Sequence, residues 1–347
     1  MNCSLILKND MTEGLSRRAM LVRLSTSALL AAGGCGRRSS RSPNAVHIAT
    51  AAGGLNMTMS ELLRQQKFLE SFDLNPDMVA MADGTKILGG VYSGSIDVSP
   101  MSGFGQVFPA VERGADLKII NAATLIPALA LFSGKPYVRS LKDFEGKVVG
   151  VGAIGALVHQ LTVTLLRKYS VDVSAVRFVN IGSNTDIFKG VMAGPVDAGV
   201  GPASFVDDAE SYKVHAIPNG NMSVELKEFT YQAGWTSNRV IESRRGVLVR
   251  VLAAYAKLFR FVQQPSARAA FLSARKSVFP NAPEREHVAE WNYLQTFRPF
   301  ASDLMLSPER VRYMQQINLD FHIQNEMLPF DRVVDLSLAQ DAQKLLA

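Results

Sequence analysis

Cysteine is nearly absent from this chain. Of its 347 residues only Cys3 and Cys35 are cysteines, and none occurs from residue 36 to residue 347. The body of the chain therefore cannot hold a disulfide framework or a cysteine-ligated metal site. A body without thiols is compatible with a protein on either side of a membrane.

Strong charge and long apolar runs are absent as well. Charged residues make up 20% of the chain and hydrophobic residues 47%, which is typical of a globular protein, and the length suits two lobes. The formal charge of +6 is not concentrated in a stripe on the sequence, because the basic pairs at 37–38 and 244–245 are short, so we expect no nucleic-acid partner.

The apolar run 119–132 is interrupted by two polar residues and a proline, which favours a core strand and crossover over a membrane span.

The first 35 residues have the features of an export signal. Residues 16–21 (SRRAML) have the form of a twin-arginine signal, and the apolar stretch 24–32 is too short to anchor the chain. Small residues precede Cys35, as a signal peptidase requires. We therefore expect a signal peptide over residues 1–35, a linker over 36–44 and a mature protein in the periplasm. Two points stay open. Cys35 is either acylated, which would anchor the protein to the membrane, or unmodified. The alternative to export is that the arginine pair is a chance feature of a cytoplasmic N-terminal arm.

From residue 45 onward, the hydrophobic pattern alternates between short strands and helices. Residues 46–51 form an apolar run, and residues 60–72 have apolar side chains at helical spacing. Further strands are expected at 77–82, 96–98, 117–123, 147–151, 176–179 and 196–200, and further helices at 86–92, 106–113, 156–169, 186–193, 247–262 and 308–326. Such alternation predicts an α/β fold with mostly parallel sheets flanked by helices, followed by a helical C-terminal region.

A glycine motif in the middle of the chain suggests a second function. Residues 150–155 (GVGAIG) match G-x-G-x-x-G between a predicted strand and a predicted helix, the context of a dinucleotide site. An exported NAD(P)-dependent oxidoreductase is therefore an alternative. However, the next strand ends at Asn180, where an acidic residue should bind the ribose, and the motif follows a complete β/α lobe. Glycines there also let a polar group approach the free N–H groups at the start of a helix.

Several short motifs together resemble one family. Residues 140–151 (SLKDFEGKVVGV) are similar to the start of the second lobe of periplasmic solute-binding proteins, whose usual form is L-x-D-L-x-G-K-x-V-G. Residues 193–198 (AGPVDA) are similar to the G-x-V-D-A element of that family, and residues 93–98 (SGSIDV) repeat it in the first lobe. In order and spacing they resemble the sulfonate-, nitrate- and thiamine-precursor-binding proteins of ABC importers.

This resemblance implies a two-lobed periplasmic-binding-protein fold of type II. Lobe 1 would comprise residues 45–125 and 236–347, and lobe 2 residues 126–235. The resemblance implies an extracytoplasmic solute-binding component of an ABC transporter that closes its lobes on a small-molecule solute and delivers it to permease transmembrane subunits. It implies no catalysis, no cofactor and no metal, and we expect a monomer. A solute sensor remains an alternative, whereas a thiamine-pyrimidine synthase would need a cysteine-rich iron motif that the body lacks.

Ligands of such sheets lie beyond the carboxyl ends of the strands. That placement gives a set of expected ligand-binding residues: Asn56, Met57, Ser102, Gly103, Phe104 and Thr124 in lobe 1, Ile154, Gly155, Ala156, Ser183, Asn184 and Gly201 in lobe 2, and Trp235 at the returning crossover. The family commonly has Gly-Ser where this chain has Gly155 and Ala156, and the missing hydroxyl argues against a small anion such as nitrate. With few fixed charges, the site favours an organic solute with an apolar, aromatic or aliphatic body and one polar or acidic end.

Several of these residues have an alternative structural role. Asn56 could cap a helix over residues 57–72, Thr124 could satisfy backbone groups at a crossover, and Phe104 and Trp235 could belong to the core. His159 lies on the helix after the glycine turn, and we expect it to be a packed, hydrogen-bonded core residue.

Overall fold

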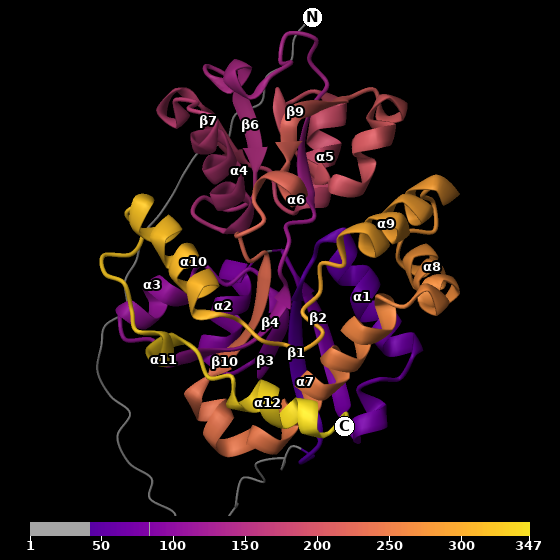
Figure 1. The fold of residues 1–347 in the computed structure, drawn as a ribbon, viewed down its shortest axis with the longest axis vertical. Coiled ribbons are helices and arrows are strands. Elements are labelled where there is room, and N and C mark those ends of the chain that lie inside the picture. The colour runs from indigo at the N-terminus through magenta and orange to yellow at the C-terminus, as the bar shows by residue number, and fades with distance from the viewer. Residues whose placement is uncertain (1–41, 83) are drawn as a thin grey trace, which may run out of the picture. The chain divides into compact units, whose positions relative to one another are not determined.

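The computed structural model describes residues 42–82 and 84–347 (Figure 1). The predicted signal peptide over 1–35, the lipidation of Cys35 and most of the linker lie outside the described residues. Within them, no helix is both long and apolar enough to cross a membrane.

The first sheet has five strands in the order β2 (Asn75–Met81), β1 (Ala45–Ala51), β3 (Val98–Ser102), β10 (Gln232–Ser237) and β4 (Leu117–Thr124). Strand β1 pairs in parallel with β2 and β3, whereas β10 runs antiparallel to β3 and β4. All residues of β3 and β10 are buried, while β2 at the edge alternates in exposure. The sheet is mixed because the chain returns to it from the second sheet as β10, which runs opposite to the other four strands. We call this sheet and its helices lobe 1.

The second sheet has the order β7 (Arg177–Asn180), β6 (Val148–Val151), β8 (Ala198–Pro202), β5 (Leu129–Ser133) and β9 (His215–Asn221). Strand β6 is parallel to β7 and β8, and β5 is antiparallel to β8 and β9. We call this sheet and its helices lobe 2. The predicted two-lobed α/β architecture is confirmed, and the apolar run 119–132 forms core strands β4 and β5 with the crossing between them. The lobe bounds at 125/126 and 235/236 stay a prediction; the first sheet itself takes in β10 from Gln232.

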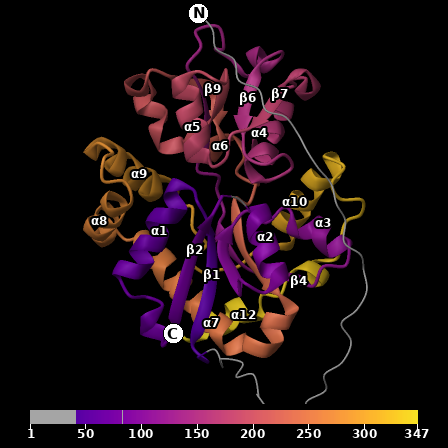
Figure 2. The same cartoon turned by 180° about the vertical axis from the view of Figure 1, so that it is seen from behind.

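Helices surround both sheets. Those of lobe 1 are α1 (Gly54–Gln65), α2 (Gly84–Ser93), α3 (Val107–Glu112), α7 (Asn238–Val262), α8 (Arg268–Val278), α9 (Glu284–Phe297), α10 (Pro308–Asp320), α11 (Phe330–Val333) and α12 (Ser337–Lys344), with short 3-10 turns η1 (Glu70–Phe72) and η5 (Pro265–Ala267). Those of lobe 2 are α4 (Leu157–Lys168), α5 (Asn184–Ala193) and α6 (Met222–Glu225), with η2 (Leu141–Phe144), η3 (Val173–Ala175) and η4 (Ala203–Tyr212). Seen from behind, α1, α8 and α9 group on one side of lobe 1 and α2, α3 and α10 on the other (Figure 2).

Several predicted elements have wrong bounds, three of them for local reasons. The helix expected up to residue 72 ends at Gln65, because Lys67 adopts a positive φ of 51°. The strand expected at 96–98 is β3, so Ser102 lies in a strand rather than a loop; its hydroxyl accepts a hydrogen bond of 2.7 Å from Ser99, which lets two serines occupy a buried strand. The helix expected up to residue 326 ends at Asp320, since His322 has a positive φ of 56°.

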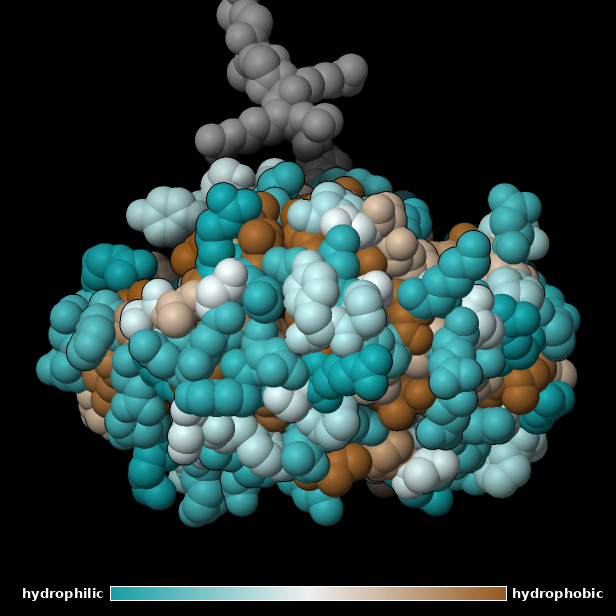
Figure 3. Space-filling view, turned by 90° about the horizontal axis from the view of Figure 1, so that it is seen from above, coloured by the Kyte–Doolittle hydropathy of each residue, from teal (hydrophilic) through white to brown (hydrophobic). Residues whose placement is uncertain are grey.

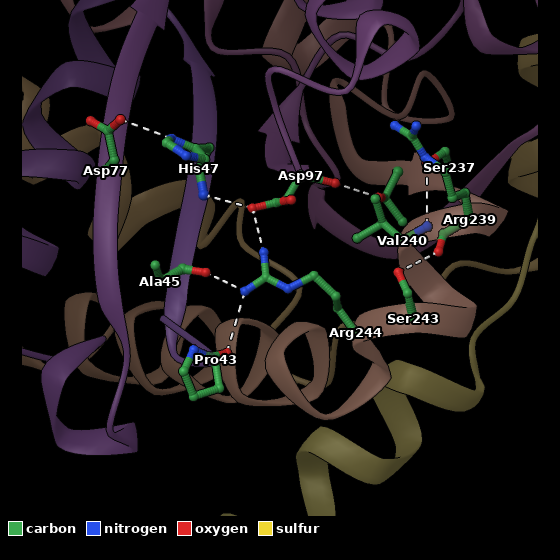
Figure 4. A network of polar contacts seen from close by, with 11 residues as sticks. Pro43, Ala45, His47, Asp77, Asp97, Ser237, Arg239, Val240, Ser243 and Arg244 are labelled. Carbon is green, nitrogen blue, oxygen red and sulfur yellow. Dashed lines mark hydrogen bonds and ion pairs between the residues drawn. The ribbon is translucent and has the colours of Figure 1, made fainter. Parts of the chain in front are cut away.

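Helix α7 begins at Asn238, nine residues before its predicted start, and is kinked at Arg244 (φ −141°, ψ 27°). The Arg244 guanidinium donates to the buried Asp97 carboxylate at 2.9 Å and to the carbonyl oxygens of Pro43 and Ala45 (Figure 4). The same Asp97 oxygen accepts from the His47 backbone N–H at 2.8 Å. Through these hydrogen bonds, Arg244 links α7 to the start of β1.

Candidate functional site

Two adjacent hollows lie between the lobes, at the carboxyl ends of strands from both sheets. The smaller one, which we call the cleft hollow, has a volume of about 50 Å³. Residues that follow β1, β3, β6 and β7 line it, among them Gly53, Asn56, Gly103, Gly152, Ala156, Leu157, Gly182, Ser183 and Asn184; Gln232, the first residue of β10, lines it as well. The predicted position of the site beyond strand ends thus coincides with a real hollow.

The larger hollow, the side chamber, has a volume of about 230 Å³. Its walls come from the start of α1, from α5 and η4 of lobe 2, and from α8 and α9 of the C-terminal region. Asn56, Asn184 and Tyr231 line both hollows, so the side chamber is continuous with the cleft. By contrast, the face of the protein shown in Figure 3 is mainly polar, with small scattered hydrophobic patches.

The structure brings together five of the expected binding residues. Asn56, Gly103, Ala156, Ser183 and Asn184 all line the cleft hollow, and Asn56 and Asn184 reach the side chamber too. The other expected residues line neither hollow: Met57, Ser102, Phe104, Thr124, Ile154, Gly155, Gly201 and Trp235.

Most residues of this second group are structural. Trp235 and Phe104 are completely buried, and the Trp235 indole donates to the Ser102 hydroxyl at 3.0 Å, so both aromatics belong to the core of lobe 1. Gly201 lies in β8 against the Phe188 ring. Ile154 is 61% exposed and lines neither hollow.

Asn56 does not cap a helix, because α1 begins at Gly54 with Gly53 as its N-cap. Instead the Asn56 amide is buried and donates to the Met101 carbonyl at 2.9 Å, while its oxygen accepts from Gln232 at 3.0 Å. Gln232 in turn accepts from the Thr124 hydroxyl at 3.3 Å. This network joins α1, β3, β4 and β10 and forms the rigid lobe 1 wall of the cleft hollow.

The first glycine of the turn packs closely. A Cβ on Gly150 would lie 3.2 Å from Ile187 and 3.3 Å from Ile181, so a larger residue there would push α5 away from β6, whereas Gly155 has open space around it and a positive φ of 82°. Helix α4 then starts at Leu157 with Ala156 as an N-cap that makes no side-chain hydrogen bond. In this conformation the hollow in front of the turn is far smaller than the several hundred Å³ of an ordinary ligand site. Asn180, at the ribose position of the dinucleotide alternative, accepts from the Gly182 N–H at 3.0 Å.

His159 is a packed core histidine, as expected. Its Nδ1 accepts from the Gly155 N–H at 3.1 Å, and its ring meets Phe178 and Phe321 edge-on at centroid distances of 4.8 and 5.7 Å. Burial, and secondly the nearby Arg167 cation, lower the pKa of His159, so the ring is neutral at pH 7.

Aromatic rings form one wall of the side chamber. Phe205 and Tyr212 stack with a centroid distance of 4.9 Å and an interplanar angle of 15°, and Phe188 lies 5.7 Å from Phe205. On the opposite side, Phe279 lies under the Arg275 guanidinium at 5.2 Å. A flat apolar group would find stacking partners on both sides of this chamber.

The polar residues of the side chamber come mainly from α8 and α9. Arg275 is only 4% exposed; its guanidinium lies 3.7 Å from the Glu290 carboxylate and 3.5 Å from the Thr58 hydroxyl, and its Nε has no hydrogen-bond partner. Glu290 also accepts from the Ser204 hydroxyl of lobe 2 at 2.8 Å. Burial, with the Glu286 carboxylate that accepts its hydrogen bond, raises the pKa of Tyr212, so its hydroxyl stays protonated.

Sequence reasoning missed the side chamber, since α8 and α9 lie far along the chain from the glycine turn. The one available signal was the presence of Arg275 and Glu290 on otherwise apolar helix faces.

Direct contacts hold the lobes together on both sides of the cleft. On the α9 side, Arg285 of lobe 1 lies 2.8 Å from Asp208 of η4. On the α10 side, Gln160 of α4 donates to the Asn318 oxygen at 2.6 Å, and the Asn318 amide donates to the Gly105 carbonyl at 2.7 Å. The lobes are therefore in contact around the hollows, and the cleft is narrow.

The chain is similar to known proteins both in sequence and in structure. Residues 64–257 match the family model described as NMT1/THI5 like. No curated protein matches the chain significantly.

Among solved structures, the alkanesulfonate-binding protein SsuA from Xanthomonas axonopodis pv. citri is 20% identical with a TM-score of 0.66, over 86% of this chain and 98% of that chain. The periplasmic nitrate-binding protein NrtA from Synechocystis PCC 6803 is 9% identical with a TM-score of 0.67, over 87% and 89%. The desulfurization enzyme DSZB is 12% identical with a TM-score of 0.61, over 88% and 100%. At these identities the likeness concerns the fold.

Proposed function

This chain belongs to the NMT1/THI5-like family, and on that basis we propose that it is the extracytoplasmic solute-binding component of an ABC import system. The observation that carries the proposal is the pair of connected hollows between the lobes, whose walls come from both sheets. A site of this kind is completed only when both lobes meet, so a bound solute stabilises the closed form. The sulfonate- and nitrate-binding proteins with the same fold support this assignment.

The solute we propose is a small organic molecule with an apolar or aromatic body and a polar or acidic end. The side chamber supports this choice, because it is walled by aromatic rings and holds a buried guanidinium. Of the binding residues expected from sequence, we retain Asn56 and Asn184, which line both hollows, and Gly103, Ala156 and Ser183, which line the adjoining cleft hollow. A bare inorganic ion would leave the aromatic wall without a role.

Export to the periplasm and delivery to permease subunits complete the proposal. The twin-arginine form of residues 16–21 supports export, and acylation of Cys35 would hold the protein at the membrane. Mass spectrometry of the protein recovered from its native host tests both points. A mature chain that begins at residue 35 and carries lipid would establish the anchor, and an uncleaved cytoplasmic chain would contradict export.

We propose binding without turnover, although one protein of similar fold is an enzyme. No cysteine is available as a nucleophile from residue 36 onward. The oxidoreductase alternative predicts a nicotinamide bound at the glycine turn, which absorbance and fluorescence of the purified protein would reveal.

A thermal-shift screen tests the function. The panel comprises aliphatic and aromatic sulfonates and carboxylates, pyrimidines, nitrate and NAD(P). A ligand that binds only the native state raises the midpoint according to its concentration relative to Kd, so a shift of several degrees with one organic class is expected. A shift with NAD(P) alone would replace the binding-protein proposal by the oxidoreductase, and no shift with any solute would refute solute binding of this kind.

A further inference from the structure

We infer that the side chamber, and not the start of α4, selects the solute, and that the solute is an aromatic carboxylic acid whose carboxylate binds Arg275. The inference rests on the proposed function, since it names the class of solute that the same cleft would capture.

The start of α4 has little room for a ligand. A Cβ on Gly103 of lobe 1 would lie only 3.0 Å from the Leu157 Cβ, so the Leu157 side chain closes the cleft directly in front of the helix. No side chain caps that helix at Ala156. The side chamber has more than four times the volume of the cleft hollow and opens beside it at Asn184 and Tyr231. The space for a solute of more than a few atoms is therefore in the side chamber.

The side chamber favours a flat ring. The Phe205–Tyr212 stack and Phe188 supply aromatic surface from lobe 2, and Phe279 supplies it from lobe 1. Aromatic rings gain from offset or edge contacts with one another beyond the apolar area that they bury. An aliphatic chain of equal size would fill the volume without these contacts.

The charged side chains that line the side chamber are the cations Lys189 and Arg275 and the carboxylates Glu286 and Glu290. The Glu286 carboxylate accepts from Tyr212, and the Glu290 carboxylate accepts from Ser204. The Arg275 guanidinium, with five N–H groups, makes only two long contacts, and its Nε has no partner. The Nε has almost no accessible surface, so the terminal guanidinium nitrogens, whose contacts are long, are the donors that a ligand acceptor would bind. A carboxylate, whose two oxygens match the planar guanidinium, meets this need best.

Arg275 and Phe279 belong to a region outside residues 64–257, the part of the chain that matches the family model. Helices α8 and α9 form one wall of the side chamber. Because α9 also contacts η4 through Arg285 and Asp208, closing the lobes brings Arg275 toward the aromatic wall of lobe 2. Solute selection would therefore depend on contacts that form only in the closed conformation.

Titration calorimetry of the whole chain with benzoate, phenylacetate, benzenesulfonate, cyclohexanecarboxylate and benzylamine tests this inference. We expect the aromatic carboxylates to bind most tightly. Arg275→Met should weaken their binding by about 10- to 100-fold, since a charge-assisted bidentate contact is lost. Lys276→Met is the matched control: it removes one positive charge from the next residue of α8, on an exposed side chain that pairs with Glu284, and should leave Kd unchanged.

Arg275→Met alone leaves the buried Glu290 without its cation and could unfold the protein. The double variant Arg275→Met/Glu290→Gln removes both charges and keeps an acceptor for Ser204, so it should fold and still fail to bind carboxylates. Tightest binding of benzylamine or of an aliphatic acid, or carboxylate affinity unchanged in the double variant, would overturn the inference. In that case, binding of any other solute of the thermal-shift panel would still support the proposed solute-binding function. The absence of all binding would refute both the proposed function and the inference about the solute.

Discussion

Gly105→Ala should shift the protein from the closed toward the open conformation without weakening either lobe. Gly105 belongs to lobe 1, and an added Cβ would lie 2.6 Å from the Gln160 side-chain oxygen of lobe 2, well inside an ordinary contact. Gln160 cannot move away freely, because it is buried and donates to Asn318 at 2.6 Å. When the lobes separate, this overlap disappears.

The magnitude follows from the cost of relieving the overlap. Inserting a methyl group into a packed interior costs about 1–3 kcal/mol, part of which is the Gln160–Asn318 hydrogen bond at about 1 kcal/mol. Since this cost applies only to the closed form, it subtracts from the free energy of solute binding. Affinity should fall by about 5- to 150-fold, given tenfold per 1.4 kcal/mol.

The body of the chain without cysteine makes the conformational measurement direct. In a Cys3→Ser/Cys35→Ser background, spin labels at Glu242→Cys in α7 and Arg177→Cys in β7 report the distance between the lobes. Gly105→Ala should increase the population of the long distance, and Gly89→Ala, at an exposed glycine with open space around its Cβ position, should not. Should Gly105→Ala instead lower the ligand-free thermal midpoint and leave the distance distribution unchanged, the Gly105–Gln160 contact would be part of a static core.

Three further predictions concern the framework of the site. Asn56→Ala should lower the free energy of unfolding by about 1–3 kcal/mol in urea titrations, because Gln232 and the Met101 carbonyl lose their buried partner; the exposed Asn75→Ala should have little effect, and equal effects would contradict the role of Asn56. Burial lowers the pKa of His159 in the folded protein below its ordinary value of 6.5. As the pH falls through 6.5, this histidine is protonated in the unfolded chain before it is protonated in the folded protein, so stability should decline below that pH. His159→Asn should flatten this decline in thermal midpoints, while the contribution of His287, whose pKa burial also lowers, remains; an unchanged slope would exclude His159 as a source of the decline. Arg244→Met should destabilise the protein by about 3 kcal/mol because the buried Asp97 carboxylate loses its ion pair with Arg244, and Arg244→Met/Asp97→Asn should recover much of the loss; no recovery would mean that the carbonyl contacts of Arg244 dominate.

The sequence by itself determined the architecture and the location of the cleft. Alternating apolar runs predict strands and helices, and these can bury their apolar sides only in layered α/β lobes. Strand ends followed by small and polar residues predicted the cleft hollow, where Asn56, Gly103, Ala156, Ser183 and Asn184 meet. The role of His159 was also predictable, because an isolated histidine on the apolar face of a helix is buried with that face.

Only the tertiary structure decided which expected residues reach the cleft. Ser102 and Trp235 carry polar groups and were expected to contact a ligand, but they satisfy each other inside lobe 1. Their pairing joins β3 to β10, two strands that come together through a crossing from the other lobe. Local patterns hold no information on such a contact, since the two residues lie more than a hundred positions apart.

The same reason explains why the side chamber could not be predicted. Arg275 and Glu290 lie on two separate helices, and Phe205 and Tyr212 lie on a turn of the other lobe. Arg275 and Glu290 on the buried faces of their helices are a local signal, but it does not indicate which residues they meet. Their meeting around one cavity depends on how α8 and α9 pack against α1 and η4, which is a property of the folded chain and not of any segment.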